Sequence, residues 1–262
     1  MSSDVKPRLK RALVTNDDGI DATGLTIAEH VAASIAEEVW TVAPVGDYSG
    51  GSRQLTLHQA LRLREYGDRR FALTGSPADC IFVGIGAVMK DFQPDIVVSG
   101  VNAGVNIGGD VGFSGTVGAA LTAQSLGVPA LALSQAWLGS REDIPWQTSR
   151  QWLPEVAARL VSDLAWPWTY VPNVNVPATT PNEVVGIEVT QQGHSAIVVP
   201  TIEHRLDLRN QKYYWLYMHK ENEDPAPDED IAALRRNAIS VTPLGHDITD
   251  QAGIAELIKA LN

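Results

Sequence analysis

The first half of the chain alternates short aliphatic runs with longer stretches of helical periodicity. Five of the runs predict strands, at residues 11–15, 38–43, 71–74, 95–99 and 130–134. Three stretches between them predict helices, at about 24–36, 77–89 and 116–126. Because strands and helices alternate in this way, we expect an α/β fold built on a doubly wound, mainly parallel sheet.

The pattern changes after residue 137. The later elements that we expect are a helix at 146–166, strands at 173–177, 184–190 and 239–242, and a short helix at 254–261. The aromatic run at 213–217 is more typical of packing or an interface than of base stacking. The acidic, proline-containing segment 221–230 predicts an exposed loop. We therefore divide the chain into a core of about 1–140 and a C-terminal extension of about 141–262.

Composition and charge narrow the range of partners. The chain has 262 residues, of which 44% are hydrophobic and 19% are charged, which is enough for a substantial core. Its net charge of −11 argues against binding to a nucleic-acid duplex, because such binding needs lysine and arginine to neutralise phosphates. A small phosphorylated substrate is compatible with this charge, since a bound metal ion supplies positive charge locally.

Cysteine content and hydropathy bear on the compartment. Cys80 is the only cysteine, so no disulfide can form within the chain, which fits a reducing environment. The apolar stretch after the basic start is interrupted at Asn16, too early for a signal peptide. No apolar run approaches the roughly 20 residues that span a membrane. We therefore expect a cytoplasmic protein with no membrane partner.

Three loops that follow predicted strands carry the candidate chemistry. In an open parallel sheet, ligands bind beyond the carboxyl ends of the strands. The loops after the first, second and fourth predicted strands contain Asp17-Asp18, Ser49, and Asn102 with Asn106. They are rich in glycine and in oxygen-bearing side chains, and none offers a pair of histidines or cysteines. Such donors favour a hard cation, namely Mg²⁺, Mn²⁺ or Ca²⁺, over zinc.

The neighbouring carboxylates of Asp17 and Asp18 support a metal site only in part. When two carboxylates lie at contact distance, the pKa of one of them is raised unless a cation stabilises the pair. The alternative is an Asx-type turn that caps the first helix. The residues alone leave both interpretations open.

Two further segments mark helix starts. Ser114-Gly115-Thr116 precedes an alanine-rich helix, and backbone N–H groups at a helix N-terminus suit a phosphate. The alternative is that Ser114 is an ordinary N-cap. In Ser76-Pro77-Ala78-Asp79, the spacing makes Asp79 a capping residue first and a catalytic candidate second.

Several motifs occur in one order along nearly the whole chain. They are VTNDDGI at 14–20, VAP at 42–44, SG at 49–50, LTL at 55–57, GSPADC at 75–80, PDIVVSGVNAGVN at 94–106, SGTV at 114–117, NVNVP at 173–177 and SVTPL at 240–244. Together they resemble the SurE family of survival proteins, which are 5′/3′-nucleotidases. Gln54 stands where members often carry serine, and residues 245–250 place their histidine differently from some relatives. These departures leave the natural substrate open.

The resemblance implies a fold, an activity and a set of metal ligands. The family fold is a Rossmann-like core with a C-terminal part used in oligomerisation, which implies a homodimer or homotetramer with exchanged arms. The family activity is metal-dependent hydrolysis of nucleoside 5′- and 3′-monophosphates, in some members accompanied by exopolyphosphatase activity. The ligands that the motifs carry over to this chain are Asp17, Asp18, Ser49 and Asn102.

The same resemblance suggests how the reaction would proceed. Phosphoryl transfer needs charge neutralisation and in-line placement, so Asp17 or Asp18 is expected to orient or deprotonate the attacking water. The residues expected to bind the substrate phosphate are Asn16, Asn106, Ser114, Gly115 and Thr116. Two alternatives remain open: a specialised phosphatase of a biosynthetic intermediate, and a nucleotide-binding module without turnover.

Overall fold

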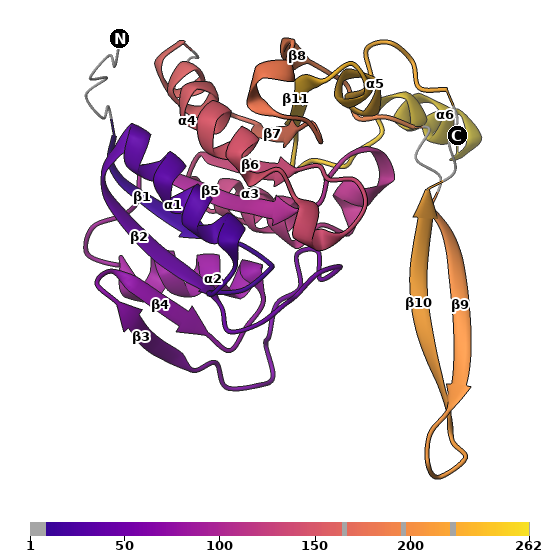
Figure 1. Ribbon diagram of the computed structural model, residues 1–262, viewed down its shortest axis with the longest axis horizontal. Coiled ribbons are helices and arrows are strands. Elements are labelled where there is room, and N and C mark those ends of the chain that lie inside the picture. The colour runs from indigo at the N-terminus through magenta and orange to yellow at the C-terminus, as the bar shows by residue number, and fades with distance from the viewer. Residues whose placement is uncertain (1–8, 164–166, 195–197, 221–223, 262) are drawn as a thin grey trace.

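A sheet of nine strands runs through the centre of the protein (Figure 1). The computed structural model describes residues 9–163, 167–194, 198–220 and 224–261. The strands of this sheet are β1 Leu9–Thr15, β2 Ala36–Pro44, β3 Leu63–Gly67, β4 Arg70–Leu73, β5 Ile96–Ala103, β6 Ala130–Gln135, β7 Val171–Val176, β8 Gly186–Val189 and β11 Ala238–Leu244. Their order across the sheet is β3-β4-β2-β1-β5-β6-β7-β11-β8.

Four helices cover the two faces of this sheet (Figure 1). They are α1 Thr23–Ile35, α2 Pro77–Val83, α3 Gly115–Ser125 and α4 Trp146–Asp163. Side chains of β1 alternate between two hydrophobic clusters: Ala12 and Val14 pack on the side of α1 and α4, and Leu13 packs on the side of α2 and α3. Because both faces are buried, the central strands read as continuous apolar runs in the sequence.

The centre of the sheet is parallel, which determines where a ligand can bind. β1 pairs in parallel with β2 and β5, and β6 continues this direction beside β5. The carboxyl ends of β1, β2 and β5 therefore lie next to one another at one edge of the sheet. β3 and β11 are each antiparallel to a neighbour, so the sheet is mixed toward its two sides.

Most of the predicted elements of the first half are present. The five predicted strands correspond to β1, β2, β4, β5 and β6. The predicted helix at 77–89 is α2 followed by a π-helical turn at Gly84–Val88. The sheet continues past residue 140 into β7, β11 and β8, so both halves of the chain contribute to one sheet.

The strand β3 and the helix α5 have no counterpart among the predictions, and neither do the two strands of the hairpin described below. All five residues of β3 are exposed, so this edge strand shows no buried alternation in the sequence. The helix α5, Asp230–Arg235, begins where the predicted acidic loop ends, and residues 221–223 of that loop lie outside the described residues.

The remaining predicted elements differ mainly at their ends. The predicted helix at 146–166 corresponds to α4 as far as Asp163, and residues 164–166 lie outside the described residues. The terminal helix α6, Gln251–Leu261, begins earlier than predicted. Within the described ranges, no helix has the length and apolar character that crossing a bilayer requires.

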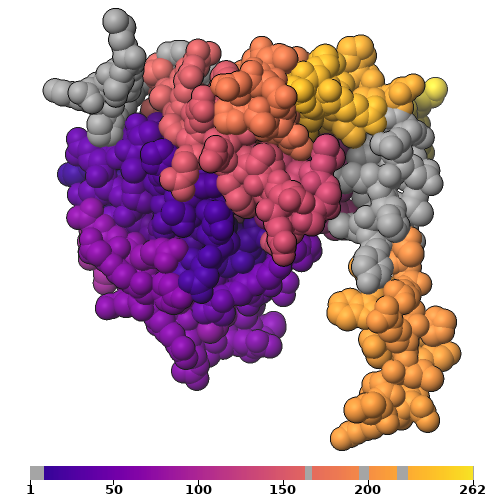
Figure 2. All heavy atoms as spheres, in the orientation of Figure 1, coloured from indigo at the N-terminus to yellow at the C-terminus, as the bar shows by residue number. Residues whose placement is uncertain are grey.

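An antiparallel hairpin projects from the body of the protein (Figures 1 and 2). It consists of β9 Val198–Leu206 and β10 Lys212–Lys220, and it contains the predicted aromatic run. Cross-strand partners Ile202 and Leu216 are 63% and 67% exposed, and Tyr214 is 64% exposed. The hairpin therefore carries large apolar side chains that the rest of its own chain does not cover.

Candidate active site

The loops at the carboxyl ends of β1, β2 and β5 meet around one cavity of about 250 Å³. We call it the metal cavity, because the sequence-predicted donors converge on it. Its lining includes Asp17, Asp18, Ser49, Asn102, Asn106 and Ser114. The parallel arrangement of the strands explains why loops so far apart in sequence lie together here.

Asp17 is a buried carboxylate held by the start of α3. Its side chain accepts a hydrogen bond from Thr116 Oγ1 at 2.6 Å and another from Thr116 N at 3.2 Å. Removal from water raises the pKa of Asp17 to about 6, and the nearby carboxylate of Asp18 acts in the same direction. The Thr116 hydrogen bonds oppose this shift. Asp17 is thus destabilised as an anion and would gain from a cation beside it.

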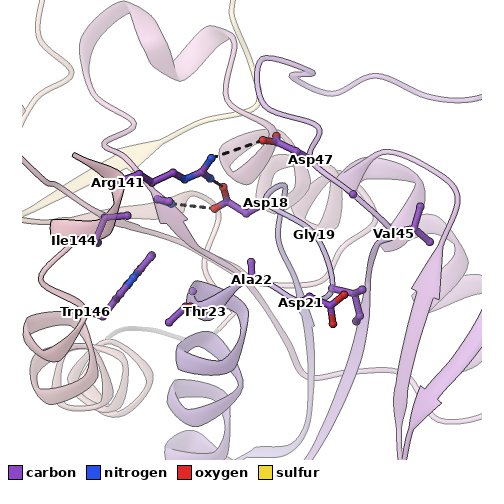
Figure 3. A pocket seen from close by; sticks show the side chains of 14 residues that line it. Asp18, Gly19, Asp21, Ala22, Thr23, Val45, Asp47, Arg141, Ile144 and Trp146 are labelled. Atoms are coloured by element: carbon purple, nitrogen blue, oxygen red, sulfur yellow. Dashed lines mark hydrogen bonds and ion pairs between the residues drawn. The ribbon is translucent and has the colours of Figure 1, made fainter. Parts of the chain in front are cut away.

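Asp18 is held by a backbone amide and by an arginine that sequence reasoning missed. Its Oδ2 accepts from Ala103 N at 3.0 Å, and its Oδ1 accepts from Arg141 (Figure 3). A second nitrogen of Arg141 lies 3.9 Å from Asp47 Oδ2. Burial raises the pKa of Asp18, although the Ala103 amide and the Arg141 charge oppose the shift. Arg141 lies 123 residues further along the chain, so no local pattern could have linked it to Asp18.

The other two predicted ligands add neutral oxygens. The side-chain nitrogen of Asn102 donates to Gly104 O at 2.9 Å, which leaves its amide oxygen available to a cation. Ser49 is exposed in the loop after β2, whose backbone is tied to Asp17 by a 2.8 Å bond from Tyr48 N to Asp17 O. Two carboxylates, a hydroxyl and an amide oxygen fit a hard divalent cation.

Histidine and cysteine do not contribute to a metal cluster here. Among the residues that the structure describes, no group of three or more His, Cys, Asp or Glu side chains could hold a metal ion. The candidate site therefore depends on the hydroxyl and amide donors as well as on the Asp17–Asp18 pair. This composition favours magnesium, manganese or calcium over zinc.

Asn106 is fixed by a buried polar network on β6 and β7. Its backbone N donates to Asn175 Oδ1 at 2.8 Å, and its side-chain nitrogen donates to Ser134 Oγ at 2.8 Å. Asn173 and Asn175 both donate to Asn106 O. An amide nitrogen carries two hydrogens, so Asn106 can still donate one bond into the metal cavity that it lines.

The C-terminal part of the chain anchors the same loop. Gly108 N donates to Asp230 Oδ2 at 2.9 Å, and Gly108 O accepts from Gln192 Nε2 at 2.8 Å. Asp230 also accepts from Gly193 N and Ile231 N. Asp230 is the last residue of the segment predicted as an exposed loop, and its burial makes that prediction wrong at this position.

Two residues expected at the phosphate have other partners in the structure. Asn16 is fully buried, donates to Gly19 O at 2.9 Å and accepts from Gly19 N, so it closes the turn that presents Asp17 and Asp18. Thr116 is fully buried against Asp17 and does not line the metal cavity. The reason is that Asp17 is itself the anion at the N-terminus of α3.

The other predicted phosphate residues form the beginning of α3. Ser114 lines the metal cavity and also caps the helix, with Val117 N donating to Ser114 Oγ at 3.0 Å. Gly115 lies under Asp17, where a Cβ atom would come within 2.8 Å of the Asp17 side chain. Asp79, the other candidate, forms the predicted capping box with Ser76 and lies outside the metal cavity.

Comparison with known proteins bears directly on this site. The family model for the survival protein SurE matches residues 12–198, which include all four predicted metal ligands. The chain belongs to the SurE family. The resemblance inferred from the motifs is thereby confirmed.

Full-length SurE relatives support the same assignment. The 5′-nucleotidase SurE 1 of Burkholderia lata is 44% identical over 258 residues, covering 98% of this chain and 99% of that protein. The 5′-nucleotidase SurE of Parvibaculum lavamentivorans is 40% identical over 253 residues, covering 96% of this chain and 90% of that protein. The crystal structure of the SurE protein from Aquifex aeolicus matches with a TM-score of 0.80 at 29% identity, covering 96% of this chain and 99% of the other. The predicted α/β fold class is confirmed by this likeness.

In this SurE chain, the substitution Thr116→Val is expected to weaken Mn²⁺ binding about tenfold. Asp17 is a candidate ligand, and losing a hydrogen bond to a ligand's carboxylate costs about that much affinity. The matched control is Thr122→Val in the same helix, whose hydroxyl donates instead to Gly118 O at 2.7 Å. Calorimetric titration of both variants with Mn²⁺ checks the prediction. Equal affinities for the two variants would show that Thr116 does not support Asp17.

Metal affinity of this SurE chain is expected to fall as the pH drops below about 6. Because burial raises the pKa of Asp17 to about 6, a cation must displace a proton at lower pH. The dissociation constant for Mn²⁺ should be nearly constant above pH 7 and rise by up to about tenfold per pH unit below pH 6. Titrations between pH 5 and 8, in buffers of different ionisation enthalpy, would measure both affinity and proton release. An affinity that is flat across this range contradicts the prediction.

Proposed function

We propose that this chain is a divalent-metal-dependent 5′/3′-nucleotidase that hydrolyses nucleoside monophosphates to nucleoside and phosphate. The observation that carries the proposal is the convergence of Asp17, Asp18, Ser49 and Asn102 on one cavity. It is supported by 44% identity to a 5′-nucleotidase SurE over nearly the whole chain. Mg²⁺ or Mn²⁺ is the proposed cofactor, in keeping with the oxygen donors.

The chain's own residues divide the work of the reaction between them. Asp17, Asp18, Ser49 and Asn102 would hold the cation, which supplies positive charge for the phosphate and acidifies water at that position. Asn106 and Ser114 line the same cavity and would donate hydrogen bonds to phosphate oxygens. Asp17 or Asp18 would orient the attacking water or accept its proton, in line with the departing ester oxygen.

Phosphate release is expected to depend entirely on added divalent metal. We expect the protein to release phosphate from AMP with Mn²⁺ or Mg²⁺, and to stop on addition of a chelator, because Arg141 is the one lysine or arginine among the described residues that line the metal cavity. A panel of nucleoside 5′- and 3′-monophosphates, sugar phosphates and polyphosphate, assayed for inorganic phosphate, tests this. Full activity after exhaustive chelation, with metal absence confirmed by elemental analysis, contradicts the metal requirement.

The same panel separates the alternatives. Hydrolysis confined to one non-nucleotide phosphate ester would identify a specialised phosphatase. Nucleotide binding without phosphate release would identify a binding module. Broad release from nucleoside monophosphates supports the proposed function.

Assembly and location are part of the proposal. A homodimer or homotetramer is supported by the uncovered apolar side chains of the β9–β10 hairpin and by α6, which has no buried residue among those described. A cytoplasmic location is supported by the single cysteine, Cys80, which is buried and free of any disulfide.

A further inference from the structure

The segment of residues 136–145, between β6 and α4, contributes side chains to three neighbouring cavities. Trp137 lines the metal cavity and an adjoining cavity of about 600 Å³, which we call the apolar cavity. Arg141 lines the metal cavity and another of about 390 Å³, which we call the acidic cavity. We propose that this segment recognises the nucleotide, with Arg141 binding its phosphate and Trp137 its nucleoside. The proposal deepens the nucleotidase function and rests on it.

The size of the metal cavity requires the substrate to extend beyond it. At about 250 Å³ it is smaller than the 300–1,000 Å³ typical of pockets that enclose a small molecule. It has room for a cation and a phosphate group. The nucleoside therefore extends beyond it, and the two adjoining cavities are the candidate sites for the base.

The apolar cavity is the better match for a nucleobase. It shares Ala103, Val105 and Trp137 with the metal cavity, so the two cavities adjoin. Its other walls include Leu138 and Leu234. Nucleobases stack on aromatic rings in a way that tolerates different bases, because every base has a π-face. This predicts recognition of the nucleoside without strong preference for one base.

Trp137 is oriented for such a contact. Its indole Nε1 donates to Ala103 O at 3.2 Å, which fixes the ring beside the end of β5. The ring is only half-buried, and the next residue, Leu138, is 77% exposed. These apolar surfaces beside a polar metal cavity are uncovered in the protein and would be covered by a bound nucleoside.

The acidic cavity is less suitable for the base. Asp18, Asp21 and Asp47 line it, and Arg141 forms ion pairs with Asp18 and Asp47 (Figure 3). Like the apolar cavity, it shares three lining residues with the metal cavity, here Asp18, Ala103 and Arg141. The two adjoining cavities therefore differ in their lining, and the three carboxylates make the acidic cavity the poorer match for an uncharged base.

Arg141 has the position and chemistry to bind the phosphate. Its side chain is 56% exposed, whereas that of Asp18 is 5% exposed, so the guanidinium reaches in from the surface to a buried carboxylate. A cation at Asp18 would repel the guanidinium. Arg141 would then exchange Asp18 for a phosphate oxygen, to which its planar set of donors is suited.

The Arg141→Ala variant tests the phosphate half of the proposal through two effects of opposite sign. The dissociation constant for Mn²⁺, measured by calorimetry, should fall several-fold because the competing positive charge is gone. The inhibition constant of inorganic phosphate should rise about tenfold, and KM should rise for both AMP and ribose 5-phosphate. The control is Arg150→Ala, which removes an exposed arginine of α4 that lines neither the metal nor the acidic cavity. Unchanged or weaker Mn²⁺ binding, or unchanged phosphate inhibition, overturns this half.

The Trp137→Leu variant tests the nucleoside half. KM for AMP should rise about tenfold, while KM for ribose 5-phosphate, which lacks the base, should change less than about twofold. Trp137→Phe keeps an aromatic ring and should restore most of the affinity for AMP. Equal changes in KM for the two substrates overturn the assignment. Trp146 lines the acidic cavity, so a rise in KM for AMP alone in Trp146→Leu, with no such rise in Trp137→Leu, also overturns it.

These outcomes are distinguishable from failure of the nucleotidase function. If the parent protein releases phosphate from AMP and the variants behave like the parent, the recognition segment is refuted and the nucleotidase stands. If the parent releases phosphate from neither substrate, the nucleotidase proposal fails together with the nucleoside half. The effect of Arg141→Ala on Mn²⁺ affinity is measured without substrate and tests the ion-pair exchange in either case.

Discussion

Asp17→Asn and Asp18→Asn are each expected to lower kcat by at least about 100-fold while the fold survives. Each change removes a negative oxygen from the candidate cation site and misplaces the group that orients the attacking water. The fold should persist because the turn is closed by Asn16 and Gly19, whose mutual bonds do not involve either carboxylate. Steady-state hydrolysis of AMP with saturating Mn²⁺ measures the effect.

Stability measurements separate loss of function from loss of fold. Burial raises the pKa of Asp17 to about 6, so at pH 8 its charge lowers the free energy of unfolding of the metal-free protein. This loss of stability is absent below the ordinary pKa of an aspartate. It grows as the pH rises from that value to about 6 and is constant at higher pH. Asp17→Asn should therefore melt no lower than the parent in chelator at pH 8, and Mn²⁺ should stabilise the parent more than the variant.

Asp91→Asn provides the matched control, since Asp91 is exposed and lines none of the three cavities. It should leave kcat unchanged. If Asp17→Asn and Asp18→Asn also hydrolyse AMP near the parental rate, the pair serves the turn alone and the proposed metal site is refuted.

Charging the apolar face of the hairpin is expected to dissociate the protein into smaller species. Light scattering of the parent should give a mass at least twice the 28.2 kDa of one chain. Ile202 and Leu216 are cross-strand partners on one face of the hairpin. His204 and Tyr214 are the next pair on that same face. Replacing both Ile202 and Leu216 by glutamate puts like charges directly opposite each other and makes burial against a partner chain costly.

The control for this experiment is Arg209→Glu, a charge change in the turn between β9 and β10. It should leave the mass of the parent assembly unaltered. A dilution series to micromolar concentration shows whether the assembly is stable. A parent that is already monomeric, with intact hydrolysis, would contradict the oligomer and would assign the exposed hairpin face to another use.

The sequence predicted the elements whose burial imposes a pattern. β1, β5 and β6 are buried on both faces, so their apolar runs were evident, and the loops beyond their carboxyl ends held the candidate ligands. The turn and the metal site appeared as competing interpretations of Asp17 and Asp18. In the structure Asn16 makes the turn, which leaves both carboxylates facing the cavity.

The contacts that sequence reasoning missed join residues that are far apart and have no local signature. Thr116 lies 99 residues from Asp17, and Arg141 lies 123 residues from Asp18. Thr116 was predicted to bind the substrate phosphate and not to hold Asp17, and Arg141 belonged to none of the predicted motifs or elements. β3 escaped prediction for another reason: an edge strand exposed along its length is held by backbone pairing with β4, which leaves no trace in hydropathy.

The anchoring of the Asn106 loop by Asn173, Asn175 and Asp230 limits how this protein could have been assembled from modules. The loop that faces the metal cavity belongs to the first half of the chain, yet its backbone partners are supplied by the second half. A gene fragment ending near residue 140 would encode the candidate cation ligands without the groups that hold Asn106 in place. We therefore expect recombination between relatives to be tolerated in the β9–β10 hairpin more readily than at the midpoint of the chain.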